Sequence, residues 1–223
     1  MNRDSHLADL KARLVAGLDP VESWTPDRRA ARSDFDLNPV RDPGQFPADR
    51  PLRAAAVLIP VIAHAAGPTV LLTRRSDRMT SHTGQIAFPG GRLDPGETAL
   101  QAALREADEE VSLSPSVVEV LGLGDTYETG TGFRITPVVG WIAAPPILSP
   151  SADEVAEVFE TPLDFLMDIA NHRRDFYDTE AGSRRWFWAM PWQDRYIWGV
   201  TAGILRGLHA RLYGEVAIDK GAA

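Results

Sequence analysis

Residues 91–113, GRLDPGETALQAALREADEEVSL, are the part of the chain that most constrains its fold. The letters DPG within them favour a turn, and Thr98 followed three residues later by Gln101 fits the capping box that starts a helix. Apolar residues then recur at helical spacing, at Leu100, Leu104, Ala107 and Val111. The segment therefore predicts a turn followed by an amphipathic helix whose apolar side is buried against the rest of the domain.

The polar side of this helix gathers three carboxylates, those of Glu106, Glu109 and Glu110. Residues spaced i, i+3 and i+4 are neighbours on a helix surface, where like charges repel by about 0.2–0.5 kcal/mol per pair. A hard divalent cation would replace that repulsion with coordination, because Mg²⁺ prefers oxygen ligands. Taken alone, such glutamates are more typical of a solvated helix face, so the metal hypothesis depends on the wider pattern.

The wider pattern resembles the signature of the Nudix hydrolases, position by position. Gly91, Glu97 and the run READEE at residues 105–110 stand at the spacing of that signature, and Leu113 closes it. The one departure is Ser112, where the family has a glycine that ends the helix. A serine at this place is strained if the backbone must be left-handed, so the departure concerns the local turn and not the glutamates.

The resemblance implies a role for each matching residue. It implies that Mg²⁺ or Mn²⁺ binds to the carbonyl of Gly90 and to the carboxylates of Glu106, Glu109 and Glu110. It also implies that Arg105 orients Glu97 through a charge-assisted pair, and the alternative for Arg105 is an ordinary surface ion pair, which contributes little. Glu109 is the candidate acceptor of the proton from the attacking water, although Nudix proteins differ in where that base lies.

Upstream, residues 71–91 resemble a second motif, which marks the coenzyme A pyrophosphatase branch of the Nudix family. The matching positions are Leu71, Leu72, Thr73, Arg75, Ser76, Gly84, Phe88, Pro89, Gly90 and Gly91. Thr80 stands where the branch has a second arginine, and Arg78 lies two residues earlier. This departure bears on the identity of the substrate more than on hydrolysis itself.

The same segment predicts a substrate-binding surface beside the metal site. Its members are Arg74, Arg75, Ser76, Arg78, Gly84 and Phe88. Coenzyme A carries a 3′-phosphate as well as its diphosphate, and the planar fork of arginine donates two hydrogen bonds to a phosphate at once. The alternative is that these arginines form the solvated end of a strand. His82 is interpreted as a loop residue, because it has no metal-ligand partner at useful spacing.

The two motifs together imply metal-dependent hydrolysis of a diphosphate linkage. By resemblance, the substrate is coenzyme A or acyl-coenzyme A, cut to 3′,5′-ADP and (acyl-)4′-phosphopantetheine. Thr80 keeps open a Nudix hydrolase of another nucleoside diphosphate derivative, such as ADP-ribose or a dinucleotide. A non-catalytic, nucleotide-sensing Nudix module is a further alternative, but such a module is expected to lose the carboxylates that this chain retains.

Charge and composition narrow the partners. The net charge of −8 argues against a broad nucleic-acid surface, so local arginines and the metal must attract an anionic nucleotide substrate. The absence of cysteine excludes disulfides and thiol catalysis. We expect no membrane span, because no apolar run approaches the required length of about 20 residues, and we see no secretory signal. The expected location is therefore cytoplasmic, and a homodimer is a possible assembly.

The chain is expected to contain one folded domain with extensions at both ends. Residues 1–52 are predicted to form a helix over 4–17 and then an irregular extension that wraps the domain or stays mobile. Residues 53–213 are predicted to form the Nudix domain and 214–223 a tail. Strands are expected at 53–64, 70–74, 86–88, 117–127, 135–143, 154–159, 175–178 and 185–190, and helices at 163–169 and 198–213. This mixture predicts an α+β fold, and the resemblance implies a mixed sheet sandwiched between helices.

Two later segments leave their function open. Residues 129–139 enter a strand through a glycine-rich turn, which is either a plain hairpin or a place where the backbone approaches a ligand closely. Tyr196 and Trp198 open the last predicted helix. We interpret both as core or interface aromatics in preference to residues that stack on a base.

Overall fold

The computed structural model describes residues 3–40, 47–76, 84–179 and 182–216. Its centre is a mixed sheet of nine strands. These strands are β1 (Arg32–Ser33), β2 (Arg53–Ile62), β3 (Thr69–Arg75), β4 (Ile86–Ala87), β5 (Gly90–Arg92), β6 (Glu119–Leu123), β7 (Tyr127–Glu128), β8 (Phe133–Ile142) and β9 (Val155–Pro162). The order β1-β7-β8-β2-β3-β4 forms the main path, and β5, β6 and β9 pair with β2, β8 and β3. The long strands β2 and β8 run parallel at its middle.

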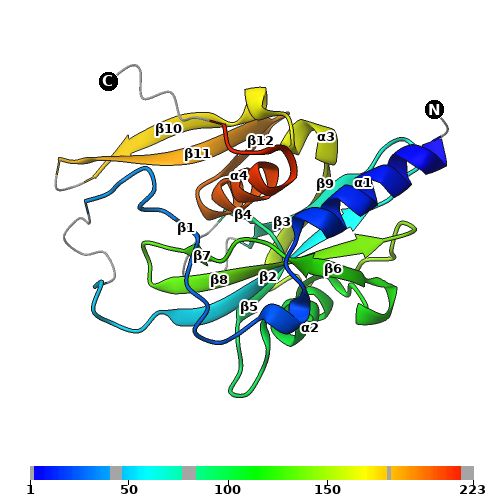
Figure 1. The fold of residues 1–223 in the computed structure, drawn as a ribbon, viewed down its shortest axis with the longest axis horizontal. Coiled ribbons are helices and arrows are strands. Elements are labelled where there is room, and N and C mark those ends of the chain that lie inside the picture. The colour runs from blue at the N-terminus through cyan, green and yellow to red at the C-terminus, as the bar shows by residue number, and fades with distance from the viewer. Residues whose placement is uncertain (1–2, 41–46, 77–83, 180–181, 217–223) are drawn as a thin grey trace.

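Helices cover both faces of this sheet, and a second, smaller sheet lies outside one of them. The helices are α1 (Arg3–Gly17), α2 (Ala99–Val111), α3 (Leu163–Leu166) and α4 (Val200–Tyr213), with 3₁₀ turns at Val21–Ser23, Pro115–Val117 and Ile169–Asn171. The small antiparallel sheet contains β10 (Arg173–Asp178), β11 (Arg184–Trp192) and β12 (Arg195–Trp198). Figure 1 shows α2 on one face of the main sheet and α1 and α4 on the other, with the small sheet beyond α4. The expected α+β sandwich is confirmed.

The two faces of the main sheet bury separate cores because successive side chains of a strand point to opposite sides. On β2, Leu58 and Ile62 pack in the core beneath α2. Ile59 and Val61 belong to the core beneath α1 and α4. Such a strand reads as a nearly continuous apolar run, as expected for one buried on both faces. None of the helices in the described ranges is long and apolar enough to cross a membrane.

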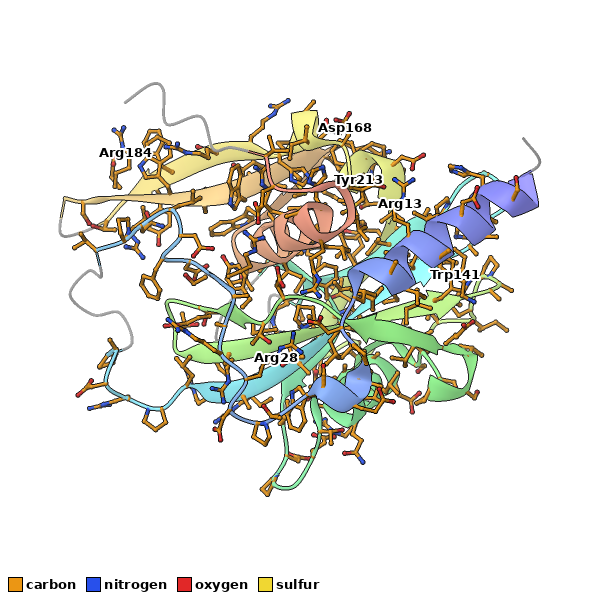
Figure 2. The ribbon with its side chains drawn as sticks, viewed as in Figure 1. Arg13, Arg28, Trp141, Asp168, Arg184 and Tyr213 are labelled. Atoms are coloured by element: carbon orange, nitrogen blue, oxygen red, sulfur yellow. The ribbon has the colours of Figure 1, made fainter. Side chains whose placement is uncertain are left out.

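The described part of the N-terminal extension wraps the domain, which was one of the two expectations. Leu14 and Leu18 are buried in the core, and Asp19 forms an isolated bridge with Leu123. Strand β1 then pairs with β7, so the extension supplies an edge of the main sheet. Figure 2 shows Arg13 of α1 beside Tyr213 at the end of α4, where the guanidinium carbon lies 5.2 Å from the ring centroid.

Several element boundaries differ from the prediction. The closing helix starts at Val200, because Gly199 has a φ of 64° and breaks the chain direction after Trp198. Trp198 therefore ends β12 and does not open the helix. The helix expected over 163–169 ends at Leu166. Strands β1, β5 and β12 were not predicted, since runs of two to four paired residues leave little periodicity to detect.

Helix α2 begins and ends where the sequence predicted. Both capping-box bonds are present: Gln101 N–H donates to Thr98 Oγ1 at 3.3 Å, and Thr98 N–H donates to Gln101 Oε1 at 2.9 Å. Ser112 ends the helix in the left-handed region, with φ 57° and ψ 34°. Its Oγ donates to the carbonyl oxygen of Ser149 at 3.1 Å. The serine therefore adopts a strained left-handed conformation that a glycine would adopt freely.

This strain is measurable with two substitutions at one position. Ser112→Gly and Ser112→Ala both remove the bond to Ser149, but only glycine relieves the left-handed strain, which is worth roughly 1–2 kcal/mol. We expect the free energy of unfolding, measured with urea, to be higher for the glycine variant than for the alanine variant by about that amount. Equal stabilities would contradict a strained Ser112.

Candidate active site

A cleft of about 730 Å³ opens on the main sheet where β5 leads into α2. Its charged lining consists of the guanidinium groups of Arg53, Arg75 and Arg92 and the carboxylates of Asp94, Glu106, Glu110 and Glu154. A further wall comes from Trp198, Val200, Thr201 and Ile204, around the start of α4. The cleft thus places acidic groups and arginines within one hollow, as a cation-assisted phosphate site requires.

Close packing of α2 carries two of its glutamates into this cleft. Ala99 and Ala103 are fully buried against the sheet. Glu106 and Glu110 each follow one of these alanines by seven residues, which is nearly two turns, so they lie in line with the buried side. Glu110 is only 4% exposed as a result. The helical spacing predicts this glutamate on the exposed face opposite the apolar residues, and its burial corrects that prediction.

Two glycines allow the strand before the helix to come this close. Gly90 pairs with Val57 of β2, and a β-carbon at Gly90 would lie 2.7 Å from the Val57 Cα. A β-carbon at Gly91 would instead overlap the carboxylate of Glu106, with Oε2 at 2.8 Å. Gly90 therefore lets β5 lie close to the backbone of β2, and Gly91 leaves space for the carboxylate of Glu106.

Arg105 binds three of the glutamates predicted for the site. Its Nε and Nη2 donate to the two oxygens of Glu97 at 2.9 and 3.0 Å, a bidentate pair. Its Nη1 donates to Glu106 at 2.9 Å and to Glu109 at 3.0 Å. Arg105 lowers the pKa of Glu97 below its usual range, and Glu97 in turn raises the pKa of Arg105. Since the Glu97 side chain is only 13% exposed, this pair is more than a solvated surface contact.

Glu110 has weaker partners than its burial would suggest. The backbone N–H of Gly90 donates to its Oε2 at 3.3 Å, and Arg75 Nη1 lies 3.9 Å from its Oε1. Burial raises the pKa of Glu110 to about 7, although the charge of Arg75 acts in the opposite direction. Burial also raises the pKa of Glu106, against the effect of Arg105. The cleft therefore holds carboxylates whose negative charge is incompletely compensated.

The donors in the cleft fit a hard divalent cation in their chemistry. Glu106, Glu110 and Glu154 supply carboxylate oxygens, which Mg²⁺ and Mn²⁺ prefer. Among the described residues, however, no three acidic or histidine side chains are gathered closely enough to hold an ion. Glu109 is turned to Arg105, and its side chain is 60% exposed. In this arrangement Arg105 occupies the oxygens of Glu106 and Glu109 that a cation would need.

The residues predicted to bind substrate divide into two groups. Arg75 and Phe88 line the cleft. Arg74 points to the other face of β3, where its Nε donates to Glu157 of β9 at 3.4 Å. Arg74 therefore has a structural partner away from the cleft, because neighbouring side chains on a strand alternate.

Ser76 and Gly84 also lie outside the cleft lining. Ser76 is buried, and its N–H donates to the carbonyl of Glu154 at 2.8 Å. Gly84 adopts a φ of 70°, and its N–H donates to the carbonyl of Arg75 at 3.3 Å. Both support the position of Arg75 through the backbone. Arg78, Thr80 and His82 fall outside the described residues.

Several cleft residues carried no signal in the sequence. Arg53, Arg92 and Glu154 are isolated charges whose positions depend on distant chain segments. Trp198, interpreted as a core or interface aromatic, is half-buried and lines the cleft. The glycine-rich segment 129–139 was predicted to be either a plain hairpin or a place of close approach to a ligand. It forms part of the cleft wall, through Thr129, Thr131, Phe133 and Ile135.

Comparison with known proteins shows which family this chain resembles. A family model described as NUDIX domain matches residues 52–179. A protein of Pectobacterium atrosepticum described as uncharacterized Nudix hydrolase NudL is 44% identical over 167 residues, covering 73% of this chain and 85% of that protein. A protein of Citrobacter koseri with the same description is 48% identical over 161 residues, with coverages of 70% and 81%. Among solved structures, the Nudix hydrolase RenU from M. smegmatis is 28% identical with a TM-score of 0.46, covering 53% of this chain and 76% of that one.

The chain therefore belongs to the Nudix hydrolase family. Hydrolases of this family act on small nucleotide-type molecules that contain a diphosphate, and they generally use a divalent ion such as Mg²⁺ or Mn²⁺. The relatives' descriptions name no substrate.

The two glycines before α2 predict opposite outcomes for the same substitution. Gly91→Ala displaces only the end of a flexible side chain, so we expect the melting temperature to stay within a few degrees, as is usual for changes of about 0.5 kcal/mol, while Mg²⁺-dependent turnover falls strongly. Gly90→Ala meets the β2 backbone, and we expect it to lower the melting temperature markedly. Thermal unfolding and turnover measured on both variants check this, and a stable, fully active Gly91→Ala would show that Glu106 does not need its present place.

Proposed function

We propose that this protein hydrolyses the diphosphate linkage of coenzyme A or acyl-coenzyme A, giving 3′,5′-ADP and (acyl-)4′-phosphopantetheine. The observation that carries the proposal is the buried carboxylate of Glu110 beside the guanidinium of Arg75 in one cleft. An under-compensated carboxylate favours a cation, and a cleft arginine favours a phosphate. A diphosphate bound together with a metal ion would place a cation beside the carboxylate and a phosphate beside the guanidinium.

Residues of the Nudix signature, with Gly90 beside it, supply the ligands in this proposal. Gly90 through its carbonyl, and Glu106, Glu109 and Glu110 through their carboxylates, would hold Mg²⁺ or Mn²⁺. When bound, such an ion offsets the charge of the phosphoryl oxygens and lowers the pKa of a water molecule. To hold the ion, Glu106 and Glu109 would have to give up their bonds to Arg105, whose bidentate pair with Glu97 would not be needed for the ion.

The protein's own groups perform the proton transfer and the positioning. Glu109 accepts the proton of the attacking water, whose oxygen forms the new bond to phosphorus as the bridging P–O bond breaks. Arg75 donates to the diphosphate oxygens, and Arg53 and Arg92 line the same cleft. Because the net charge is −8, these local guanidinium groups must attract the substrate against the field of the whole protein.

The specificity for coenzyme A is supported by the motif over residues 71–91. Its Arg75 and Phe88 lie in the cleft, and its Pro89-Gly90-Gly91 segment leads into α2. The rival substrates, ADP-ribose and dinucleotides, share the diphosphate but lack the 3′-phosphate of coenzyme A. A sensing module is disfavoured, because this chain retains the four glutamates of the Nudix signature, Glu97, Glu106, Glu109 and Glu110.

Replacing Glu110 with glutamine separates stability from function. Since its pKa in the folded state is about 7, the protonated form stabilises the fold, and this contribution is lost as the pH rises from 4.5 to above 7. In chelator at pH 8, Glu110→Gln should therefore melt at a higher temperature than the wild type. Mg²⁺ should raise the melting temperature of the wild type but not of the variant, and turnover should fall by roughly two orders of magnitude or more.

Asp108→Asn is the matched control for this experiment. It makes the same charge change on an exposed position of α2 that does not line the cleft. We expect it to keep both the Mg²⁺-induced stabilisation and the turnover. A Glu110→Gln variant that turns over at a near-normal rate would remove Glu110 from the metal site.

The choice among substrates is tested by removing a single phosphate. With Mg²⁺ present, the ratio kcat/KM for coenzyme A should exceed that for dephospho-coenzyme A by about tenfold to a hundredfold, since a charge-assisted hydrogen bond contributes roughly 1.5–3 kcal/mol. ADP-ribose serves as the comparison from the rival class. Equal turnover of the two coenzyme A forms would exclude recognition of the 3′-phosphate and favour the rival.

A further inference from the structure

A second cavity of about 720 Å³ adjoins the cleft. It lies between residues 33–38 of the N-terminal extension, the turn after β7, and the small sheet. Gln85, Thr131, Trp198 and Val200 line both hollows. The two hollows therefore share part of a wall and lie side by side. Figure 1 shows the N-terminal extension passing between the small sheet and β7.

One wall of this second cavity is aromatic. Tyr177, Phe187 and Trp198, one from each strand of the small sheet, line it together. The ring centroids lie 6.0 Å apart for the first pair and 4.9 Å apart for the second. Tyr177 is 51% exposed, and the other two rings are half-buried. A connected series of rings that keeps accessible surface inside a hollow offers π faces to a planar ligand.

The facing wall carries a carboxylate that is fixed in place. The two oxygens of Asp34 accept from the Tyr127 hydroxyl at 2.9 Å and from the Gly130 N–H at 2.7 Å. Both donors belong to the β7–β8 hairpin, so the carboxylate is tied to the main sheet. Each oxygen has the capacity for a second donor, because a carboxylate accepts about four hydrogen bonds. Asp34 is thus an oriented acceptor at the edge of the aromatic cavity.

The extension is locked to the small sheet by one amide. Asn38 Nδ2 donates to the Trp186 carbonyl at 2.7 Å, and the Trp186 N–H donates to Asn38 Oδ1 at 2.8 Å. The side chain imitates a neighbouring strand where β11 extends beyond β12. Arg185 adds a bond from Nη1 to the Val40 carbonyl at 2.9 Å. The two walls are therefore held at a set separation before any ligand arrives, which lowers the entropic cost of binding.

We propose that this second cavity binds the purine base of the substrate, with the ring against the aromatic wall of Tyr177, Phe187 and Trp198 and an exocyclic amino group donating to Asp34. The inference rests on the proposed function, because it takes the diphosphate of that substrate to lie in the adjoining cleft. The other half of a coenzyme A molecule, the flexible pantetheine chain, would gain little from flat rings and an oriented carboxylate. A purine base can interact with both walls, since its π face stacks on the aromatic rings and the amino group at its edge donates to Asp34.

The first test measures binding without turnover. ADP is titrated in the presence of chelator, with binding followed by calorimetry. Phe187→Leu keeps an apolar side chain but removes the ring, and stacking on a base is worth about 1–3 kcal/mol, which corresponds to roughly 5-fold to 150-fold in affinity. We expect ADP to bind that much more weakly to the variant, while inorganic pyrophosphate binds as it does to the wild type.

Two neighbouring residues of β10 provide a matched pair for the case in which Phe187→Leu fails to fold. Tyr177 and Phe176 are both exposed aromatics, but only Tyr177 lines the second cavity. Tyr177→Leu should weaken ADP binding, and Phe176→Leu should leave it unchanged. The proposal is overturned if wild-type protein does not bind ADP, if both variants behave alike, or if these variants weaken 4′-phosphopantetheine and not ADP.

The second test concerns the amino group. IDP carries an oxo group where ADP carries its 6-amino group, so the wild type should bind ADP more tightly by about tenfold or more, as for a lost charge-assisted bond. Asp34→Asn can donate to the oxo group, and the preference should then fall toward one. Equal binding of ADP and IDP by the wild type would overturn the role of Asp34. Because no step requires hydrolysis, failure here is distinguishable from failure of the proposed activity, which would appear as absent turnover with Mg²⁺.

Discussion

The packing of α2 against β2 and β5 is the constraint on which the rest of the site depends. Buried alanines on the helix and two adjacent glycines on the strand let the backbones approach closely. This approach carries Glu110 into the interior, where ionisation is costly and its pKa rises to about 7. A larger side chain at the buried alanines would move the helix outward and return the glutamate to water. The small alanines and glycines are therefore the reason that the cleft contains a buried carboxylate with a raised pKa.

Two arginines partly compensate the negative charge of the glutamates that this packing brings together. Arg105 lies on α2 itself and binds Glu97, Glu106 and Glu109. Arg75 reaches Glu110 from β3 at 3.9 Å, a distance that leaves the carboxylate partly uncompensated. In the proposed function, Glu106 and Glu109 would hold a cation in place of their contacts with Arg105, and Arg75 would donate to the phosphates. The two arginines thus orient the glutamates and still leave their carboxylates available to bind a cation.

Local patterns in the sequence predicted the elements that local physics decides. The capping box at Thr98, the helical run to Val111 and the left-handed end at Ser112 all depend on residues within a turn or two of one another. The longer strands were predicted for the same reason, as apolar runs between breakers. The start of α4 was wrong by two residues, because a glycine with positive φ turned Trp198 into the end of a strand.

The sequence by itself determined the α+β class, the glutamate-bearing helix and the family, because spacing along one helix or one strand encodes them. Only the tertiary structure decided which residues share a cavity. Arg74 and Arg75 are adjacent in sequence, yet strand alternation sends the first to Glu157 and the second to the cleft. Asp34 and Trp198 meet at one cavity although more than a hundred residues separate them along the chain. Such meetings arise from strand pairing and from burial of apolar surface over long distances, which leave no periodic trace in the sequence.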